Sequence, residues 1–259
     1  MANQCLLAFD NLLEQGTVTV SNNTLGNPNE DADNPIENLY DWRTTDFYKP
    51  NELGEVHIDL EMAMPAQADY LALFAHDLHT TGCTIRLQYH DGLTYQNASP
   101  LITPADGKPL VLRFTSRVAT KWRVVVTAPT DIPSIGVLSF GASLFTERGV
   151  YLNYAEPIFA RAPELVNSVS EGGSFLGRSI ISQGFKTNLV LQYASDAWVR
   201  NYWLLFVKHA EQKPFFYLWN IEDFPGEAAF CWTVGAIPAV THTHYKYSGT
   251  TVAIEGKVE

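Results

Sequence analysis

Two imidazoles and a carboxylate stand together in the segment His76-Asp77-Leu78-His79, and His90-Asp91 follow a short distance along the chain. Imidazole and carboxylate groups are common ligands of zinc and other divalent metals, so a metal site is conceivable. The spacing matches no zinc pattern, however. His76 ends an apolar run that predicts a buried strand, so we expect a structural histidine that hydrogen-bonds the following loop, with a metal ligand as the alternative.

Two other segments carry possible metal ligands. His242 and His244, one residue apart, would project both rings to one face of a strand, and we expect them to be surface residues of an exposed arm. The acidic segment 29–34, NEDADN, offers hard oxygen ligands for Ca²⁺. It lacks the spacing and the closing glutamate of an EF-hand, so we expect a solvated loop. We predict no metal site and no cofactor.

A third group of residues could recognise a sugar. Trp42, Arg43, Tyr48 and Arg117 fall in loops or at strand ends, where a lectin-like surface could present aromatic rings and guanidinium groups. These four are the candidate carbohydrate-binding residues. In the alternative interpretation, Trp42 fills one end of a sandwich and Arg43 pairs with a carboxylate.

Catalytic signatures are missing from the sequence. It contains no G-x-S-x-G turn, P-loop, H-E-x-x-H motif or glycine-rich dinucleotide turn. A glycosidase carboxylate pair cannot be placed from sequence alone. Cys83 and Cys231 lie in apolar strands and Cys5 is distant from both, which argues against a disulfide framework and predicts small buried side chains. We expect no enzyme and no catalytic residue.

Composition narrows the class of protein. The chain has 259 residues, of which 46% are hydrophobic, and 28 acidic residues outnumber 17 basic ones to give a net charge of −11. This charge argues against a nucleic-acid partner, because phosphate binding needs clustered cations. No apolar run approaches the roughly 18 residues of a membrane-spanning helix, and the first residues show no basic segment of a secretory signal.

The elements that must position these residues are mostly short strands. Six or seven alternating or apolar runs between turn residues predict an antiparallel β-sandwich that ends near Thr146. The predicted strands lie near residues 17–21, 56–60, 70–75, 85–89, 110–114, 122–126 and 135–144. A polar loop over residues 22–38 separates the first two.

The second half predicts an α+β unit with one helix near residues 195–211. Ser195 suits the N-cap, and Pro214 stops the helix. Two apolar stripes run along it, so we expect a helix covered on more than one side. The stripes are Trp198, Tyr202, Leu205 and His209, and Val199, Trp203, Phe206 and Ala210. Strands are predicted near residues 189–193, 215–219, 228–234 and 252–258. We divide the chain into a sandwich (1–146), a linker and extended arm (147–168) and the α+β domain (169–259).

Several motifs carry a family resemblance. NLYDWR at 38–43, VHIDL at 56–60, DYLALFAHDLHTTGCTIRLQYHDG at 69–92, KWRVVV and IGVLSFGASL resemble the galactose-binding-like, discoidin-type jelly rolls of bacteriophage tail proteins. GGSFLGRS, the aromatic helix and FFYLW resemble the split-barrel domain of phage distal tail and baseplate proteins. Together the two matches cover most of the chain, although many distal tail proteins carry the ring-forming domain first.

The resemblance implies a structural virion protein, made in the host cytoplasm and located at the tail tip or baseplate. It would form a homo-oligomeric ring, serve as an adaptor between the tail tube and hub or fibre proteins, and contact the host surface through the jelly roll. The aromatic surplus of the second half favours obligate interfaces. The candidate assembly residues are Trp198, Trp203, Phe215, Phe216, Trp219, His242 and His244. A host surface glycan is a further possible partner of the jelly roll. The alternative is a non-catalytic carbohydrate-binding module that stays monomeric and binds a glycan.

Overall fold

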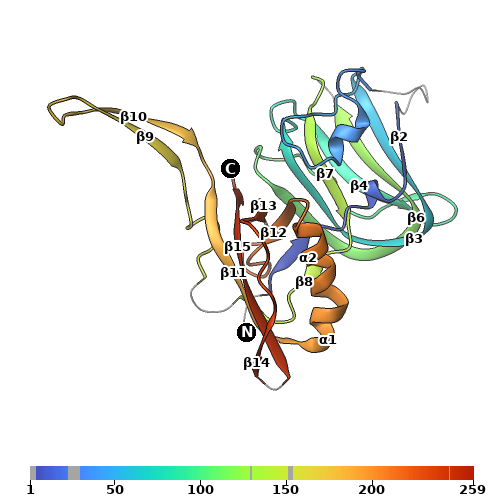
Figure 1. Cartoon of the computed structure of the whole chain (residues 1–259). Helices are drawn as coiled ribbons and strands as arrows, with labels where there is room; N and C mark the ends of the chain where they lie inside the picture. Colours follow the sequence, from blue (N-terminus) through green and yellow to red (C-terminus); the bar gives the residue numbers. More distant parts are fainter. Residues whose placement is uncertain (1–3, 23–29, 129, 151–153, 245) are drawn as a thin grey trace.

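The chain forms a β-sandwich beside a smaller α+β domain, from which a long two-stranded hairpin projects (Figure 1). The structure is a computed structural model, and it describes residues 4–22, 30–128, 130–150, 154–244 and 246–259. The mainly β class predicted from the sequence is confirmed. No helix in this described part is long and apolar enough to cross a membrane.

Two long, bent strands organise the sandwich, because each contributes to both of its layers. The hydrogen-bonded order is β2 (Thr17–Asn22), β3 (Gly54–His76), β6 (Leu110–Ala128), β4 (Thr84–His90) and β5 (Tyr95–Asn97), and β7 (Ile135–Gly141) pairs with β3. The first half of β3 lies between β2 and β6, and its second half lies between β6 and β7. The layers enclose an apolar core that includes Leu71, Trp122 and Phe140. Two short 3₁₀ helices, Leu12–Glu14 and Ile36–Leu39, add buried leucine and isoleucine side chains to this core.

Both long strands differ from the sequence prediction, which divided each into two. The segments 56–60 and 70–75 are parts of β3, and 110–114 and 122–126 are parts of β6. The exposed residues between them stay extended and paired across register shifts, so the chain bends without leaving the sheet.

A second sheet forms the smaller domain. Its order is β11 (Phe185–Ser195), β15 (Tyr247–Lys257), β13 (Ala229–Thr233), β12 (Phe215–Leu218), β1 (Leu6–Ala8) and β8 (Leu144–Phe145), and β14 (Thr241–His244) also pairs with β15. The sequence prediction placed residues 6–8 in the sandwich domain, whereas β1 pairs with β12 and β8. Along the sequence, the sandwich is therefore inserted between β1 and β8, two strands of the other sheet. A three-residue apolar run carries no information about its partner, which explains the difference.

One continuous helical segment covers a face of this sheet. It comprises α1 (Asp196–Trp198), a π-helical turn (Val199–Trp203) and α2 (Leu204–Ala210). Ser195 caps it as expected, with its hydroxyl oxygen accepting the Trp198 amide at 3.3 Å. Within this single chain, the expectation of a helix covered on more than one side is wrong. In the stripe that faces the sheet, Trp203, Phe206 and Ala210 are buried, whereas Tyr202 and Leu205 of the other stripe are exposed.

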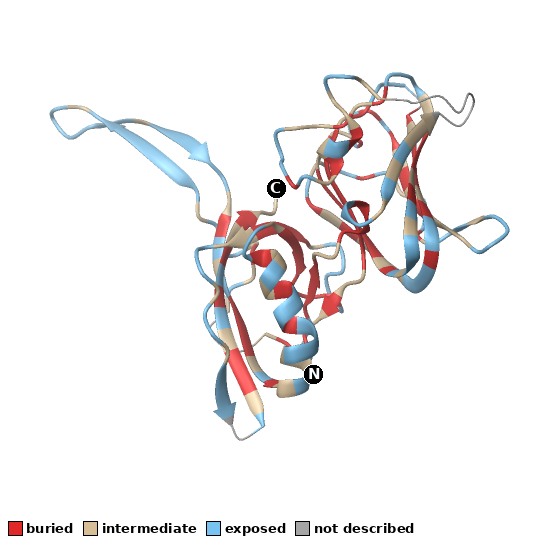
Figure 2. Ribbon diagram, turned by 45° about the vertical axis from the view of Figure 1, so that its right-hand side comes forward, coloured by how far each residue is buried: buried red, intermediate tan, exposed pale blue. Residues whose placement is uncertain are grey.

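On its other face, the second sheet is covered by the sandwich over β1, β12 and β13, which gives three layers there: helix, sheet and sandwich. The same face of β11 and β15 is exposed at Asn188, Thr251 and Ala253. Alternate residues of β12 face the two neighbours, with Phe215 and Tyr217 on the helix side and Phe216 and Leu218 on the sandwich side. On the sandwich, Phe74 of β3 is one of the residues that meet them. Figure 2 shows the resulting band of buried residues through both domains.

Replacement of Phe216 by alanine tests this shared core. The ring is fully buried and contacts Phe230 with centroids 5.2 Å apart, so we expect the free energy of unfolding to fall by about 3–5 kcal/mol. Urea denaturation followed by tryptophan fluorescence measures the change. The control Leu93→Ala removes a side chain that is 88% exposed and should change stability by no more than about 0.5 kcal/mol. A loss below about 1 kcal/mol for Phe216→Ala would contradict the shared core.

Candidate functional site

The structure does not bring the four candidate sugar-binding residues together. Trp42 and Tyr48 are buried, and they belong to different apolar clusters. Arg43 and Arg117 are exposed. Arg43 pairs with Asp46 at 3.2 Å, as the alternative interpretation expected. The four side chains therefore do not form one carbohydrate site.

Trp42 joins the two domains. Its ring stacks on Phe230 with centroids 6.4 Å apart and meets the His209 ring edge-on at 5.3 Å. Its indole N–H donates to the Glu14 carboxylate, which also pairs with Lys213 of the second domain. The backbone of Trp42 has φ +67°, an uncommon conformation for a bulky residue, and the surrounding packing must hold it there. Trp42 thus stabilises the interdomain contact and does not face solvent.

The candidate assembly residues are mostly buried inside one copy of the chain. Trp203, Phe215, Phe216 and Trp219 are almost fully covered by the chain itself, because the helix and the sandwich already occupy both faces of the second sheet over β1, β12 and β13. The prediction that these four residues form an assembly interface is therefore wrong. The remaining three differ: Trp198 is half-buried, His242 is exposed, and only the backbone of His244, at the end of β14, is described.

His76 does not hydrogen-bond its loop as expected. Both of its ring nitrogens are buried and lack a hydrogen-bond partner among the described residues. Asp77 organises the loop instead, since its carboxylate accepts the Ser134 amide at 2.8 Å and also bonds the Ser134 hydroxyl. Burial and the neighbouring His79 lower the pKa of His76 to about 4. In the described part of the chain, no three His, Cys, Asp or Glu side chains are placed to hold a metal ion.

The acidic segment over residues 29–34 is a turn. Asn29 falls outside the described residues. Asp31 accepts the Asp33 amide at 3.1 Å and the Asn34 side-chain amide at 2.9 Å. These bonds lower the pKa of Asp31 and occupy both of its carboxylate oxygens. The expected solvated loop is therefore closed by its own hydrogen bonds.

Ser248, His242 and Asp196 form a contact that superficially resembles a catalytic triad. The Ser248 hydroxyl donates to Asp196 at 3.0 Å and lies 3.3 Å from Nδ1 of His242. The same Nδ1 is also the His242 atom nearest Asp196, at 3.8 Å. A triad needs the serine and the carboxylate on opposite nitrogens of the imidazole, so this arrangement cannot relay a proton from the serine.

A polar cluster with an aromatic ring lies on the outer face of the sandwich. Arg123 bonds Asp59 through Nε at 2.6 Å and through a terminal nitrogen at 3.1 Å. The Arg123 guanidinium lies 4.0 Å from the Tyr95 ring centre, and His90 meets the same ring edge-on at 5.1 Å. Tyr95 and His90 are half-exposed. The cluster presents planar polar groups beside an aromatic ring, and sequence analysis did not find it.

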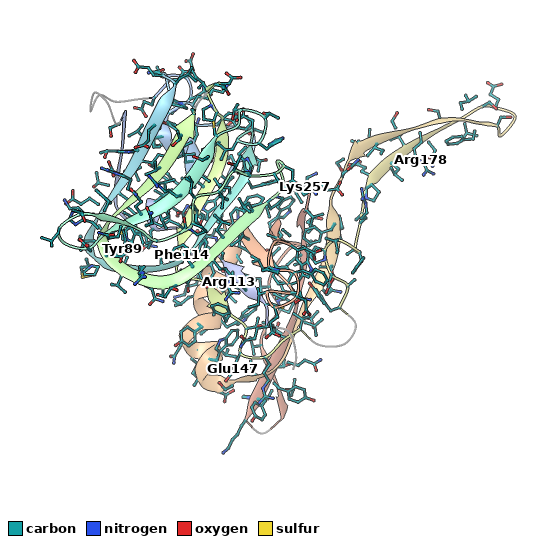
Figure 3. The ribbon with its side chains drawn as sticks, turned by 180° about the vertical axis from the view of Figure 1, so that it is seen from behind. Tyr89, Arg113, Phe114, Glu147, Arg178 and Lys257 are labelled. Carbon is teal, nitrogen blue, oxygen red and sulfur yellow. The ribbon has the colours of Figure 1, made fainter. Side chains whose placement is uncertain are left out.

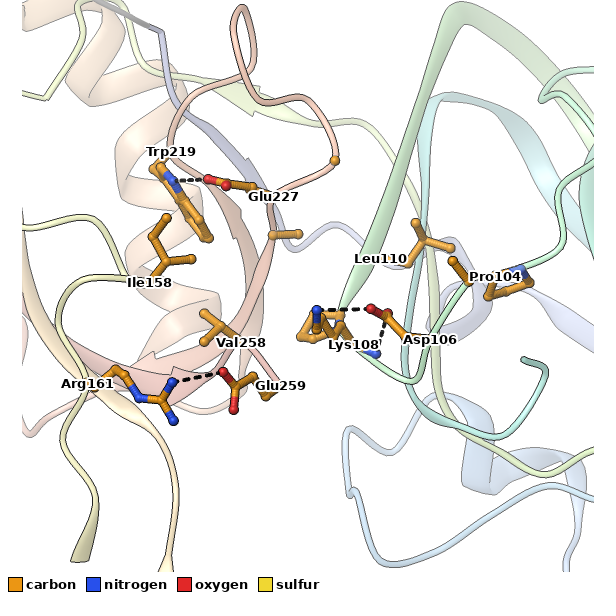
Figure 4. Close-up of a pocket in the computed structure, with 14 residues that line it drawn as sticks. Pro104, Asp106, Lys108, Leu110, Ile158, Arg161, Trp219, Glu227, Val258 and Glu259 are labelled. Atoms are coloured by element: carbon orange, nitrogen blue, oxygen red, sulfur yellow. Dashed lines mark hydrogen bonds and ion pairs between the residues drawn. The ribbon is translucent and has the colours of Figure 1, made fainter. Parts of the chain in front are cut away.

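A groove of about 390 Å³ lies between the sandwich and the second domain (Figure 4). Three polar pairs line it: Asp106–Lys108 at 3.0 Å, Arg161–Glu259 at 3.2 Å and the Trp219 indole with Glu227 at 3.0 Å. Opposite charges thus compensate each other in the first two pairs. The Glu227 carboxylate, which accepts from the neutral Trp219 indole, leaves the lining with one acidic group in excess.

The largest exposed apolar feature is the hairpin of β9 (Glu164–Val169) and β10 (Phe175–Ser182), here called the arm. Figure 3 shows it extending far from the rest of the chain, with Arg178 along its length. Nearly every residue of both strands is exposed. The arm carries seven exposed large hydrophobic residues: Leu165, Val166, Val169, Phe175, Leu176, Ile180 and Ile181.

Register places most of the large side chains of the arm on one face. Leu165, Asn167 and Val169 share one face of β9 because alternate residues of a strand do so, and the register sets Ile180, Arg178 and, across a shift between Phe175 and Gly177, Phe175 directly opposite them. The middle pair is joined by a 2.7 Å bond from Arg178 Nε to Asn167 Oδ1. We call these six residues the arm face. It presents two apolar pairs on either side of one polar pair.

Sequence analysis divided the arm between the predicted linker and the α+β domain. The signal was present in the sequence, because apolar runs at 164–169 and 175–182 flank the turn Ser170-Glu171-Gly172-Gly173-Ser174. The resemblance places the glycines of GGSFLGRS in the second domain. In the structure Gly172 and Gly173 lie in the hairpin turn, where Gly173 has φ +80°, and Gly177 lies in β10.

Searches of family models and of curated proteins found no match to the sequence. Among solved structures, a pectin-binding carbohydrate-binding module is 16% identical with a TM-score of 0.38, covering 49% of this chain and 89% of the module. The chitosan-binding module 1 of a Paenibacillus sp. IK-5 chitosanase/glucanase is 18% identical with a TM-score of 0.41, covering 51% of this chain and 99% of the module.

A GH29 fucosidase from Ruminococcus gnavus is 15% identical with a TM-score of 0.42, and the match covers 53% of this chain. The chain spans only 28% of the length of that fucosidase. At these identities and scores, the activities and ligands of the three proteins do not transfer to this chain.

The buried, neutral His76 predicts a pH-dependent stability. Its pKa is about 4 in the folded chain against about 6.5 for a free histidine, so the unfolded chain binds the proton more tightly. The contribution is complete above about pH 6.5 and is lost as the pH falls toward 4, with a total of about 3 kcal/mol. Urea denaturation at several pH values, compared between the parent and His76→Leu, isolates this effect. Parallel curves for the two proteins would show that His76 titrates normally.

Proposed function

We propose that the chain is a non-catalytic structural protein that assembles with copies of itself through the arm and displays the sandwich outward. The exposed arm is the observation that carries this proposal. A two-stranded hairpin alone is at best marginally stable in water, and contiguous exposed apolar surface typically marks an interaction site. The outer edges of the hairpin also carry backbone groups available for pairing. A partner that covers the arm would stabilise the hairpin, bury its apolar surface and pair its strand edges.

The finer proposal is a component of a bacteriophage tail tip or baseplate. Its support is the resemblance of the sequence motifs to phage tail proteins, together with an arm suited to joining subunits. In this role the protein would form a ring in the virion, connect the tail tube with hub or fibre proteins, and be made in the host cytoplasm.

Glycan binding by the sandwich is the second candidate function, and the cluster around Tyr95 favours it. A half-exposed aromatic ring can pack on a sugar ring while Arg123 and Asp59 offer a donor and an acceptor to its hydroxyl groups. This function is compatible with assembly, because the cluster lies on the sandwich and the arm on the other domain.

Assembly is tested by light scattering coupled to size exclusion over a range of protein concentrations. We expect the parent to form a defined oligomer, and Phe175→Ser with Ile180→Ser to weaken it at least about tenfold, because each change removes exposed apolar area from the arm face. Phe159→Ser is the matched control, since Phe159 is 75% exposed but lies outside the arm. A parent that remains monomeric at all concentrations would refute the proposed function.

Glycan binding is tested by titrating neutral and acidic oligosaccharides while recording heat by calorimetry. If the cluster binds sugar, Tyr95→Ala should abolish the signal, whereas Tyr193→Ala, a half-exposed tyrosine of the second domain, should keep it. The melting temperature of both variants serves as the folding control. If no oligosaccharide produces a heat of binding with the parent protein, the proposal that the sandwich binds glycans is refuted.

A further inference from the structure

The helix of the second domain has an apolar surface that the chain does not cover. Tyr202 and Leu205 are 53% and 55% exposed, and the adjacent Leu204 is also exposed. The cationic side chains of Arg200 and Lys208 flank these three residues and are exposed. We call these five residues the helix face. A helix with apolar residues on two sides is typically covered on both, so one covering partner is missing from the single copy.

The arm face and the helix face lie on different sides of the second domain. The arm leaves from the edge strand β11, whereas the helix packs on a broad face of the sheet. In both Figure 1 and Figure 2 the arm points away from the helix. The arm therefore does not cover the helix of its own chain, and a second copy is needed to bring the two surfaces together.

Building on the self-assembly proposed above, we propose that the arm face of one copy packs on the helix face of the next. The two surfaces match in length. Leu165 and Val169, the ends of the arm face on β9, lie about 14 Å apart at the usual rise of a strand, and Arg200 and Lys208, the ends of the helix face, lie about 12 Å apart at the usual rise of a helix. They also match in character, because each presents large apolar side chains interrupted by polar ones.

Charge favours the same pairing. The chain is strongly acidic overall, yet the helix face carries Arg200 and Lys208, and neither forms an ion pair with a described residue. The arm carries two exposed carboxylates, Glu164 and Glu171, against one cation, Arg178, whose guanidinium bonds Asn167 within the arm face. The arm of a second copy therefore brings apolar side chains to the apolar residues of the helix face and a carboxylate to its cations.

This contact joins two different patches, so it is heterologous and each copy can both give an arm and receive one. Repetition of such a contact closes into a ring or continues as a filament. A symmetric arm-to-arm contact would instead stop at two copies. The two arrangements make opposite predictions for mixtures of mutant chains.

The test uses two full-length variants. The arm variant carries Phe175→Ser and Ile180→Ser, and the helix variant carries Tyr202→Ser and Leu205→Glu; all four positions are exposed, so both should melt like the parent. Each variant alone should be monomeric by light scattering. Mixed in equal amounts, they should form a complex of two chains and no larger species, because the intact arm of one meets the intact helix face of the other.

A second measurement locates the contact. Cysteines introduced at Ile180 in one chain and at Leu205 in another should form a disulfide-linked dimer under mild oxidation, whereas Phe159→Cys paired with Leu205→Cys should not. The natural cysteines Cys5, Cys83 and Cys231 are all buried and should not interfere.

The outcomes separate this inference from the proposed function. If the parent oligomerises but the mixed variants stay monomeric, or if the helix variant still assembles alone, the arm-to-helix contact is refuted while self-assembly stands. If the parent is monomeric at every concentration, both are refuted. A two-chain complex in the mixture, with the matching cross-link, supports the contact.

Discussion

Burial of β1, β12 and β13 of the second sheet on both faces is the constraint on which the rest of the structure depends. One face meets the helix, and the other meets the sandwich through stacked rings such as Phe74 and Phe230, with centroids 4.9 Å apart. The sandwich is inserted between β1 and β8 of this sheet, so the chain enters and leaves it next to the shared core. The two domains are consequently one packed unit with a fixed relative placement.

The same constraint explains why some strands are apolar throughout. In β3, Leu71 and Leu73 enter the sandwich core while Tyr70 and Phe74 face the other domain, so neither side of this stretch is free to be polar. In contrast, the first half of β3 alternates, since its outer face is solvated and carries groups such as Asp59.

Local patterns predicted the elements better than their partners. The β class, the capped helix and its stop before Pro214 follow from alternation, N-cap chemistry and proline, which act within a few residues. The placement of β1 and the burial of Trp42 depend on residues more than a hundred positions away, and no local pattern encodes them. The candidate sites failed for this reason: aromatic residues indicate burial, but the sequence does not say whether the same chain or another provides it.

The difference between burial by the same chain and burial by another chain decides how the exposed apolar surfaces are interpreted. Most large aromatic side chains of the second domain are covered by the chain itself, so its apolar character is largely explained by its own fold. Single exposed apolar side chains such as Phe159, Phe224 and Val234 occur elsewhere, whereas the arm and the outer stripe of the helix each bring several of them together. A fold that satisfies nearly all of its apolar surface internally, yet leaves these two surfaces open on different sides, has the physical form of a subunit whose packing is completed by its neighbours.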